Sequence, residues 1–192
     1  VDFDMKIAFN GSVCLLDNEF IVNKMIPAKE VSIIIENAAK MGRPLAVATR
    51  SRIVTNGCDD ALREYFELAS LDSTPSEEFE DALKEDVYQF MMGCVESEWD
   101  TILEGTHSAQ IAAWWDSAVD IIPKDSGKGN AIKKVLEHLN LSVEESIAFG
   151  DGGNDVDMLL AAGTGVAMGN AADSVKAAAD EVCGSVEDDG VY

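Results

Sequence analysis

Basic residues are scarce in this sequence. Its 14 lysines and arginines stand against 36 aspartates and glutamates, which gives a formal net charge of −22. A surface of this charge repels nucleic acid and anionic membranes, so neither is expected as a partner. An anionic substrate would need basic groups or a metal ion gathered at one place to bind.

Cysteine and long apolar runs are also scarce, and each absence excludes a class of protein. The four cysteines lie far apart and form no C-x-x-C pair, so neither a zinc site nor a disulfide framework is expected. The longest weakly polar stretch, MLLAAGTGVAMGNAA, is interrupted by Gly, Thr and Asn and falls short of a membrane span. The start, VDFDMK, has neither the basic nor the apolar region of a signal peptide. With 47% hydrophobic residues, the sequence predicts a globular, soluble protein of the cytoplasm.

Apolar runs alternate with helical patterns along the chain, which is typical of α/β architecture. The first part predicts short strands at KIAF, SVCLL and EFIVNKM, a helix over about 27–41, and a mostly antiparallel sheet with helices. The acidic stretch STPSEEFEDALKED is interpreted as a solvated connection. From about residue 122 the order is strict: helix 128–139, strand SIAFG, helix 154–162, strand GVAM, helix 171–179 and strand EVC. This order predicts parallel βαβ winding.

Three aspartates, Asp151, Asp155 and Asp157, follow the predicted strand SIAFG. Because α/β sheets bind ligands at the carboxyl ends of their strands, Asp151 and Asp155 are expected to face one point there. Mg²⁺ prefers such oxygen ligands, and Lys128 at the start of a helix is a candidate to neutralise a neighbouring phosphate. In the alternative interpretation, Asp151 only ends a strand, while Asn154 and Asp155 satisfy helix-terminal amides without any metal.

The segment from about Ile121 to Tyr192 resembles the carboxyl-terminal half of the haloacid dehalogenase (HAD) superfamily phosphatases, specifically the Cof-type hydrolases. The resemblance is carried by K-G at Lys128, by G-D-x-x-N-D at 150–155, and by G-V-A-M-x-N-A and D-G-V further on. It implies an enzyme with a Rossmann-like core, of which this segment is the C-terminal half.

The resemblance also implies roles for individual residues. Lys128 would steady the phosphoryl group as a catalytic residue, while Asp151 and Asp155 would bind Mg²⁺ directly or through water. Asn154 would orient the loop, and Asn170 in the GNA turn would lie close to the site.

An inserted αβ cap domain is a further implication of the resemblance. IAFNGSVCLLDNEFIVNK resembles the entry into such a cap, and AVDIIPKDSGKG resembles its exit. The expected division is therefore a cap at residues 1–121 and the C-terminal part of the core at 122–192. Asn10 and Gly11 are expected at the hinge.

The D-x-D-G-T motif, whose first aspartate attacks phosphate in HAD phosphatases, is absent from this sequence. Asp2-Phe3-Asp4 has the right spacing, but only Val1 precedes it, and Met5-Lys6 replaces the Gly-Thr turn. A rival alignment places Thr49 of AVATRS in the family's second motif and leaves no aspartate for the first. We expect the nucleophile on a segment outside this sequence or on a second copy that completes the core. An open sheet edge beside SIAFG is then expected.

The function implied by the resemblance is that of a Mg²⁺-dependent phosphatase. It would act on small phosphorylated metabolites through an aspartyl-phosphate, and the chain alone would be inactive. The alternative is a non-catalytic, HAD-like pseudoenzyme or a metal-binding interaction module. A P-type ion pump carries a similar G-D-x-x-N-D motif, but it needs membrane helices, which this sequence does not predict.

Overall fold

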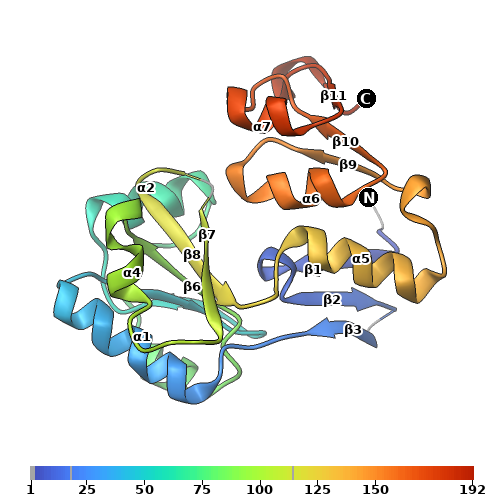
Figure 1. Cartoon of the computed structure of the whole chain (residues 1–192). Helices are drawn as coiled ribbons and strands as arrows, with labels where there is room; N and C mark the ends of the chain where they lie inside the picture. Colours follow the sequence, from blue (N-terminus) through green and yellow to red (C-terminus); the bar gives the residue numbers. More distant parts are fainter. Residues whose placement is uncertain (1–2, 18, 114) are drawn as a thin grey trace. The chain divides into compact units, whose positions relative to one another are not determined.

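The computed structural model describes residues 3–17, 19–113 and 115–192, and the chain divides into two compact units. Unit 1 combines the segments Val1–Asn23 and Asp125–Tyr192, and unit 2 is the continuous segment Lys24–Lys124 (Figure 1). The exit from unit 2 thus lies three residues from its expected place after residue 121. The expected entry is wrong, because residues up to Asn23 belong with the C-terminal segment.

Unit 2 is built on a five-stranded antiparallel sheet with the strand order β5-β4-β6-β8-β7, which confirms the expected sheet type. Its strands are β4 (Ala46–Ala48), β5 (Ile53–Thr55), β6 (Gln89–Gly93), β7 (Ala109–Ala113) and β8 (Ala118–Pro123). The central strands β6 and β8 are buried along their whole length. Alternate residues of these strands therefore face two covered sides of the sheet.

Four helices accompany this sheet: α1 (Ala28–Met41), α2 (Asp60–Leu68), α3 (Phe79–Ala82) and α4 (Trp99–Ile102). Helix α1 follows Pro27 and ends at Gly42, whose left-handed backbone (φ +67°) suits a residue without a side chain. Helix α3 corrects the interpretation of the acidic stretch as a solvated connection. Phe79 and Ala82 are buried there, because the chain turns these two apolar side chains inward and leaves the acids in solvent.

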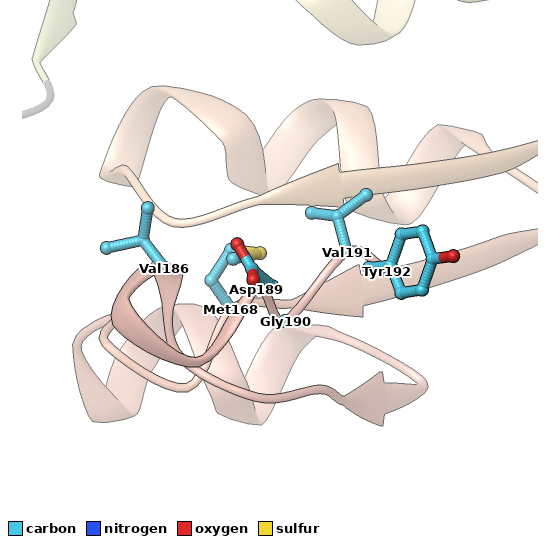
Figure 2. Close-up of a pocket in the computed structure, with 6 residues that line it drawn as sticks. All are labelled: Met168, Val186, Asp189, Gly190, Val191 and Tyr192. Carbon is cyan, nitrogen blue, oxygen red and sulfur yellow. The ribbon is translucent and has the colours of Figure 1, made fainter.

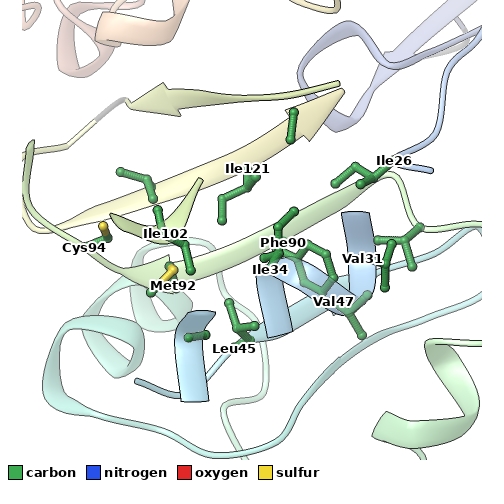
Figure 3. Packing of buried hydrophobic residues seen from close by; sticks show 14 of the residues in the cluster. Ile26, Val31, Ile34, Leu45, Val47, Phe90, Met92, Cys94, Ile102 and Ile121 are labelled. Carbon is green, nitrogen blue, oxygen red and sulfur yellow. The ribbon is translucent and has the colours of Figure 1, made fainter. Parts of the chain in front are cut away.

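An apolar cluster lies between α1 and one face of the sheet in unit 2 (Figure 3). Its members come from helices α1, α3 and α4, from strands β4, β6, β7 and β8, and from residues that flank these elements. They include Ile26, Val31, Ile34, Leu45, Val47, Phe90, Met92, Cys94, Ile102 and Ile121. Fully burying a side chain of this size stabilises a fold by about 1.5–3 kcal/mol. Helix α2 covers the opposite face, since Tyr65 donates a hydrogen bond (2.8 Å) to Asp120, which alternates with cluster residues along β8.

Glu30, in the first turn of α1, is a buried carboxylate that ties this helix to the loop before β7. Its Oε1 accepts the N–H groups of His107 and Ser108, both at 3.0 Å. Burial by itself raises the pKa of Glu30, but these backbone donors outweigh it and hold the pKa below its ordinary value. The ionised form of Glu30 therefore stabilises the folded state.

Replacing Glu30 by glutamine is expected to cost about 1–2 kcal/mol of stability at pH 7, because a charged acceptor of two backbone donors becomes neutral. A folded-state pKa below the unfolded value of 4.5 gives stability that is present above pH 4.5 and lost as the pH falls through the folded pKa. The difference between wild type and Glu30→Gln in urea unfolding should therefore shrink below about pH 4.5. A difference that stays constant from pH 7 to pH 3.5 would contradict this role of the charge.

In unit 1, the N-terminal strands form a separate antiparallel sheet with the order β1-β2-β3. These strands are β1 (Met5–Ala8), β2 (Val13–Leu16) and β3 (Glu19–Asn23), and helix α5 (Lys128–Leu139) packs against β2 and β3. The turn at Gly11 (φ +86°) lies so close to Gly127 that a Cβ atom on Gly11 would approach the Gly127 oxygen to 2.2 Å. This packing explains why Asn10 and Gly11 lie inside unit 1. Their expected place at the hinge is wrong.

The remaining strands of unit 1 form the expected parallel sheet, with the order β11-β10-β9. These are β9 (Ile147–Gly150), β10 (Thr164–Ala167) and β11 (Glu181–Val182), with helices α6 (Val156–Ala161) and α7 (Asp173–Ala178) between them in the chain. Residues of α6 and α7 form a small apolar cluster with Ala148 and Ala167. Among the described residues β9 pairs only with β10, and Ile147 is 60% exposed, so the expected open edge is confirmed.

No helix in the described ranges combines the length and the apolar character that crossing a bilayer requires.

Candidate functional site

The candidate site lies entirely within unit 1, where two loops leave the carboxyl ends of the parallel strands β9 and β10. The first loop, after Gly150, contains a single turn of 3₁₀ helix at Gly153–Asp155 and leads directly into α6. Gly150 leaves room for this turn, since a Cβ atom there would lie 2.5 Å from the Cβ of Asp155. The second loop contains Asn170 and precedes α7.

Asp155 is the centre of the site's hydrogen bonding. It is 6% exposed, and its Oδ2 accepts the N–H groups of Asp151 and Gly152, both at 3.0 Å. Its Oδ1 accepts a hydrogen bond from the Lys128 ammonium in an ion pair, in which the Lys128 side chain is 30% exposed. Burial leaves Asp155 little water, so these three donors compensate its charge.

Asp151 is the first residue of the same loop, and it is exposed. Its Oδ2 accepts a hydrogen bond from the Asn170 side-chain amide at 2.9 Å. The Oδ1 of Asn170 in turn accepts the N–H of Val186 at 3.0 Å. Asn170 therefore connects the loop after β9 with the C-terminal segment, and the structure brings it into contact with Asp151.

Asn154 contacts the N-terminal segment of unit 1. Its side-chain amide donates to Oδ1 of Asn10 at 2.9 Å, across 144 positions of sequence. Asn10 has a left-handed backbone (φ +50°), which asparagine tolerates better than most residues. The structure thus places Asn10 against the loop of the site.

Sequence reasoning missed two contacts of this site. One is the Asn10–Asn154 pair, for which the sequence holds no local signal because the partners lie so far apart. The other joins Asp157 to Gly129: Oδ2 of Asp157 accepts the Gly129 N–H at 3.0 Å. The acidic spacing did single out Asp157, but it gave no indication of a partner on another helix.

A pocket of about 350 Å³ lies at the C-terminal segment of unit 1 (Figure 2). It is lined by Met168, Val186, Asp189, Gly190, Val191 and Tyr192. Met168 follows β10 directly, and Val186 is the residue whose N–H contacts Asn170. The pocket therefore shares a wall residue with the hydrogen-bond chain that leads to Asp151.

The donor set fits part of a magnesium site. Within the described residues, no group of three or more His, Cys, Asp or Glu side chains is placed to hold a metal ion. Mg²⁺, however, usually takes only one or two protein carboxylates and keeps water and substrate phosphate as its other ligands. Asp151 and Asp155, whose residues are joined by a hydrogen bond within one short loop, supply hard oxygen ligands of that kind.

The family of the chain follows from comparison with known proteins. The whole chain, residues 1–192, matches the profile of the haloacid dehalogenase-like hydrolases. The chain therefore belongs to the haloacid dehalogenase-like hydrolase family, as its motifs indicated.

Individual relatives agree with this assignment. The chain is 27% identical over 187 residues to YkrA of Bacillus subtilis, a match that covers 96% of this chain and 72% of that protein. It is 48% identical over 77 residues to the pyridoxal phosphate phosphatase YbhA of Escherichia coli, covering 40% of this chain and 28% of YbhA. Among solved structures, the HAD subclass IIB sugar phosphatase BT4131 has 31% identity and a TM-score of 0.85, over 98% of this chain and 73% of that one.

These comparisons confirm the predicted fold class and the prediction of a HAD-superfamily phosphatase. The chain spans about 72% of the length of YkrA.

Proposed function

We propose that this chain supplies the metal- and phosphate-binding half of a Mg²⁺-dependent phosphatase that acts on small phosphorylated metabolites. The observation that carries the proposal is the ion pair between Lys128 and Asp155 at the carboxyl ends of parallel strands, with Asp151 in the same loop. This is one cation beside two hard-ligand carboxylates, which is the arrangement that binding a phosphate beside a metal requires.

The residues of the chain have distinct roles in this proposal. Asp151 and Asp155 would hold Mg²⁺, which offsets charge on the phosphoryl oxygens when it is bound. Lys128 would bind a phosphoryl oxygen with its ammonium, and Asp155 orients that ammonium through the ion pair. Asn154 would keep the loop in place through its bond to Asn10, and Asn170 would do the same for Asp151.

The reaction would proceed through an aspartyl-phosphate formed on a nucleophile that the chain, by its motifs, does not carry. Covalent catalysis of this kind divides hydrolysis into two easier steps. Asp2, the alternative candidate for the nucleophile, lies outside the described residues. Thr49, which the rival alignment places in the family's second motif, lies in unit 2 directly after β4, where its Oγ1 accepts the N–H groups of Ser51 and Arg52 within its own turn.

The substrate class in this proposal is supported by the relatives, which include a sugar phosphatase and a pyridoxal phosphate phosphatase. Small phosphorylated metabolites are found in the cytoplasm, so a cytoplasmic location belongs to the same proposal.

The experiment compares the chain of 192 residues with the product of the complete reading frame that encodes it. We expect the complete product to hydrolyse p-nitrophenyl phosphate with Mg²⁺, to lose this activity with EDTA and to regain it when Mg²⁺ is added back. The 192-residue chain alone should show no turnover. A complete product that binds Mg²⁺ without any turnover on a panel of sugar phosphates and phosphorylated cofactors would instead favour a metal-binding interaction module. Turnover by the short chain that Asp2→Asn abolishes would show that the nucleophile had been misplaced.

A further inference from the structure

Asp157 is the one acid of the group Asp151, Asp155 and Asp157 that the proposed metal and phosphate roles leave unused. It is the second residue of α6, and its carboxylate reaches a different helix. Its Oδ2 accepts the N–H of Gly129, the second residue of α5, at 3.0 Å. The carboxylate therefore joins the starts of two helices.

Helix α5 needs such a partner because it has no cap of its own. The first N–H groups of a helix have no acceptor within it, and the preceding residue usually supplies one from its side chain. At α5 that residue is Gly127, which has no side chain to offer. A carboxylate at this end of a 12-residue helix is also favoured by the helix dipole. Asp157 thus caps α5 from the neighbouring helix.

The fit between these two helix starts is tight. A Cβ atom on Gly127 (φ +127°) would lie 2.6 Å from Oδ2 of Asp157, and one on Gly129 would lie 2.3 Å from its backbone oxygen. Contacts below 3 Å force atoms to move, so only glycine fits at both positions. The first turn of α5 is therefore seated directly on Asp157.

Lys128 stands between these two glycines, and its ammonium pairs with Asp155, two residues before Asp157. We propose that Asp157 is a positioning residue, whose carboxylate holds the start of α5 against α6 so that the Lys128 ammonium stays on Asp155. The catalytic consequence rests on the proposed function, whereas the structural contact does not.

The variant Asp157→Ala removes the carboxylate and should lower kcat of the complete protein by about tenfold, the usual effect of losing a group that orients an active-site residue. KM should change less than twofold, and Mg²⁺ affinity should stay unchanged because Asp151 and Asp155 are intact. Asp157→Asn should retain most of kcat, since its amide oxygen can accept the same N–H. If Asp157→Ala does not fold, Asp157→Ser, which is too short to reach Gly129, replaces it.

Asp180→Ala is the matched control. Asp180 also accepts a glycine N–H with its carboxylate, from Gly165 at 2.8 Å, but it has no contact with α5 among the contacts described for it. Its loss should lower the melting temperature about as much as the loss of Asp157 and leave kcat unchanged. An equal fall of kcat in both variants would mean that Asp157 is merely structural, and the proposal would be overturned.

A double-mutant cycle with Lys128→Met tests whether Asp157 acts through Lys128. In the Lys128→Met background, Asp157→Ala should lower kcat no further. Multiplicative effects of the two substitutions would show that they act independently, against the proposal.

NMR separates this proposal from the proposed function. In the wild-type chain, the Gly129 amide and the Lys128 side-chain ammonium should give signals of bonded, ordered groups, and both should be lost in Asp157→Ala but not in Asp180→Ala. If the complete wild-type protein shows no turnover while the variants show these NMR changes, the proposed function is refuted and the positioning role is kept. An unchanged Lys128 signal in Asp157→Ala would refute the positioning role itself.

Discussion

Replacing Lys128 by methionine should lower the turnover of phosphate monoesters by the complete protein about 10²–10³-fold, the usual cost of removing one preorganised electrostatic group. The reason is the surrounding charge: beside Asp155 and Asp151, Lys128 is the cation through which this acidic chain would bind a phosphoryl oxygen. Methionine keeps the length and apolar stem of the side chain and removes only the ammonium. The affinity for Mg²⁺ should not fall, because the substitution removes a positive charge next to Asp155 that would repel the metal ion.

Lys134→Met provides the control for this prediction. Lys134 lies on the same helix and also forms an ion pair, with Glu137 at 2.7 Å, but both side chains are more than half exposed. Such surface pairs contribute little, so turnover should match the wild type. Steady-state kinetics of the three proteins decide the matter. Wild-type turnover in Lys128→Met would remove Lys128 from the mechanism.

The second large effect is expected when the aspartates of the loop after β9 are replaced. Asp155→Asn should weaken Mg²⁺ binding at least about 100-fold and abolish turnover, because it removes one of the two proposed charged ligands and disturbs the loop. The carboxylate accepts two backbone N–H groups on Oδ2 and the Lys128 ammonium on Oδ1. An amide has only one acceptor atom, so its NH₂ group would face either Lys128 or the loop amides, donor against donor.

The variant Asp151→Asn separates two effects: the loss of a proposed Mg²⁺ ligand and the loss of the loop's structure. Asp151 is exposed, and its bond from Asn170 survives in the variant, because the asparagine oxygen can still accept it. Mg²⁺ affinity should fall by about tenfold or more while the melting temperature stays near that of the wild type. Asp173→Asn, an acid in the first turn of α7, is the control for general charge loss. Isothermal titration calorimetry measures all four proteins, and unchanged Mg²⁺ affinity in both Asp151→Asn and Asp155→Asn would refute the metal assignment.

Local pattern was sufficient to predict the βαβ region from the sequence. The structure has α5 at 128–139 as expected, and strand β9 lies within the predicted run SIAFG. Strand β10 begins one residue before the predicted run GVAM and ends within it. The spacing of the apolar residues and the glycines near the ends of these elements indicate them in the sequence. The loop that joins β9 to α6 could be predicted for the same reason, since a glycine-rich acidic turn directly follows a short apolar run.

Contacts distant in sequence could not be predicted in the same way. Strands β1 to β3 look locally like the start of any αβ domain, and contacts distant in sequence, such as those of α5 with β2 and β3 and of Gly11 with Gly127, assign them to unit 1. The pairs Asn10–Asn154 and Asp157–Gly129 likewise depend on how helices and turns meet in space. The resemblance to HAD phosphatases pointed to loop residues that the structure brings together, but it placed Asn10 and Gly11 at the hinge, whereas they lie inside unit 1.

Unit 2 runs from Lys24 to Lys124 without interruption, so its codons span one continuous stretch of the coding sequence. Lys128, Asp151 and Asp155 are all encoded outside that stretch. A recombination event, or a gene synthesis, that exchanged codons 24–124 for those of a relative would transplant one whole sheet with its helices and its own core. The acids and the lysine would be inherited unchanged. Chimaeras of this type would test whether exchanging unit 2 alone changes the substrate preference, while Lys128, Asp151 and Asp155 in unit 1 stay the same.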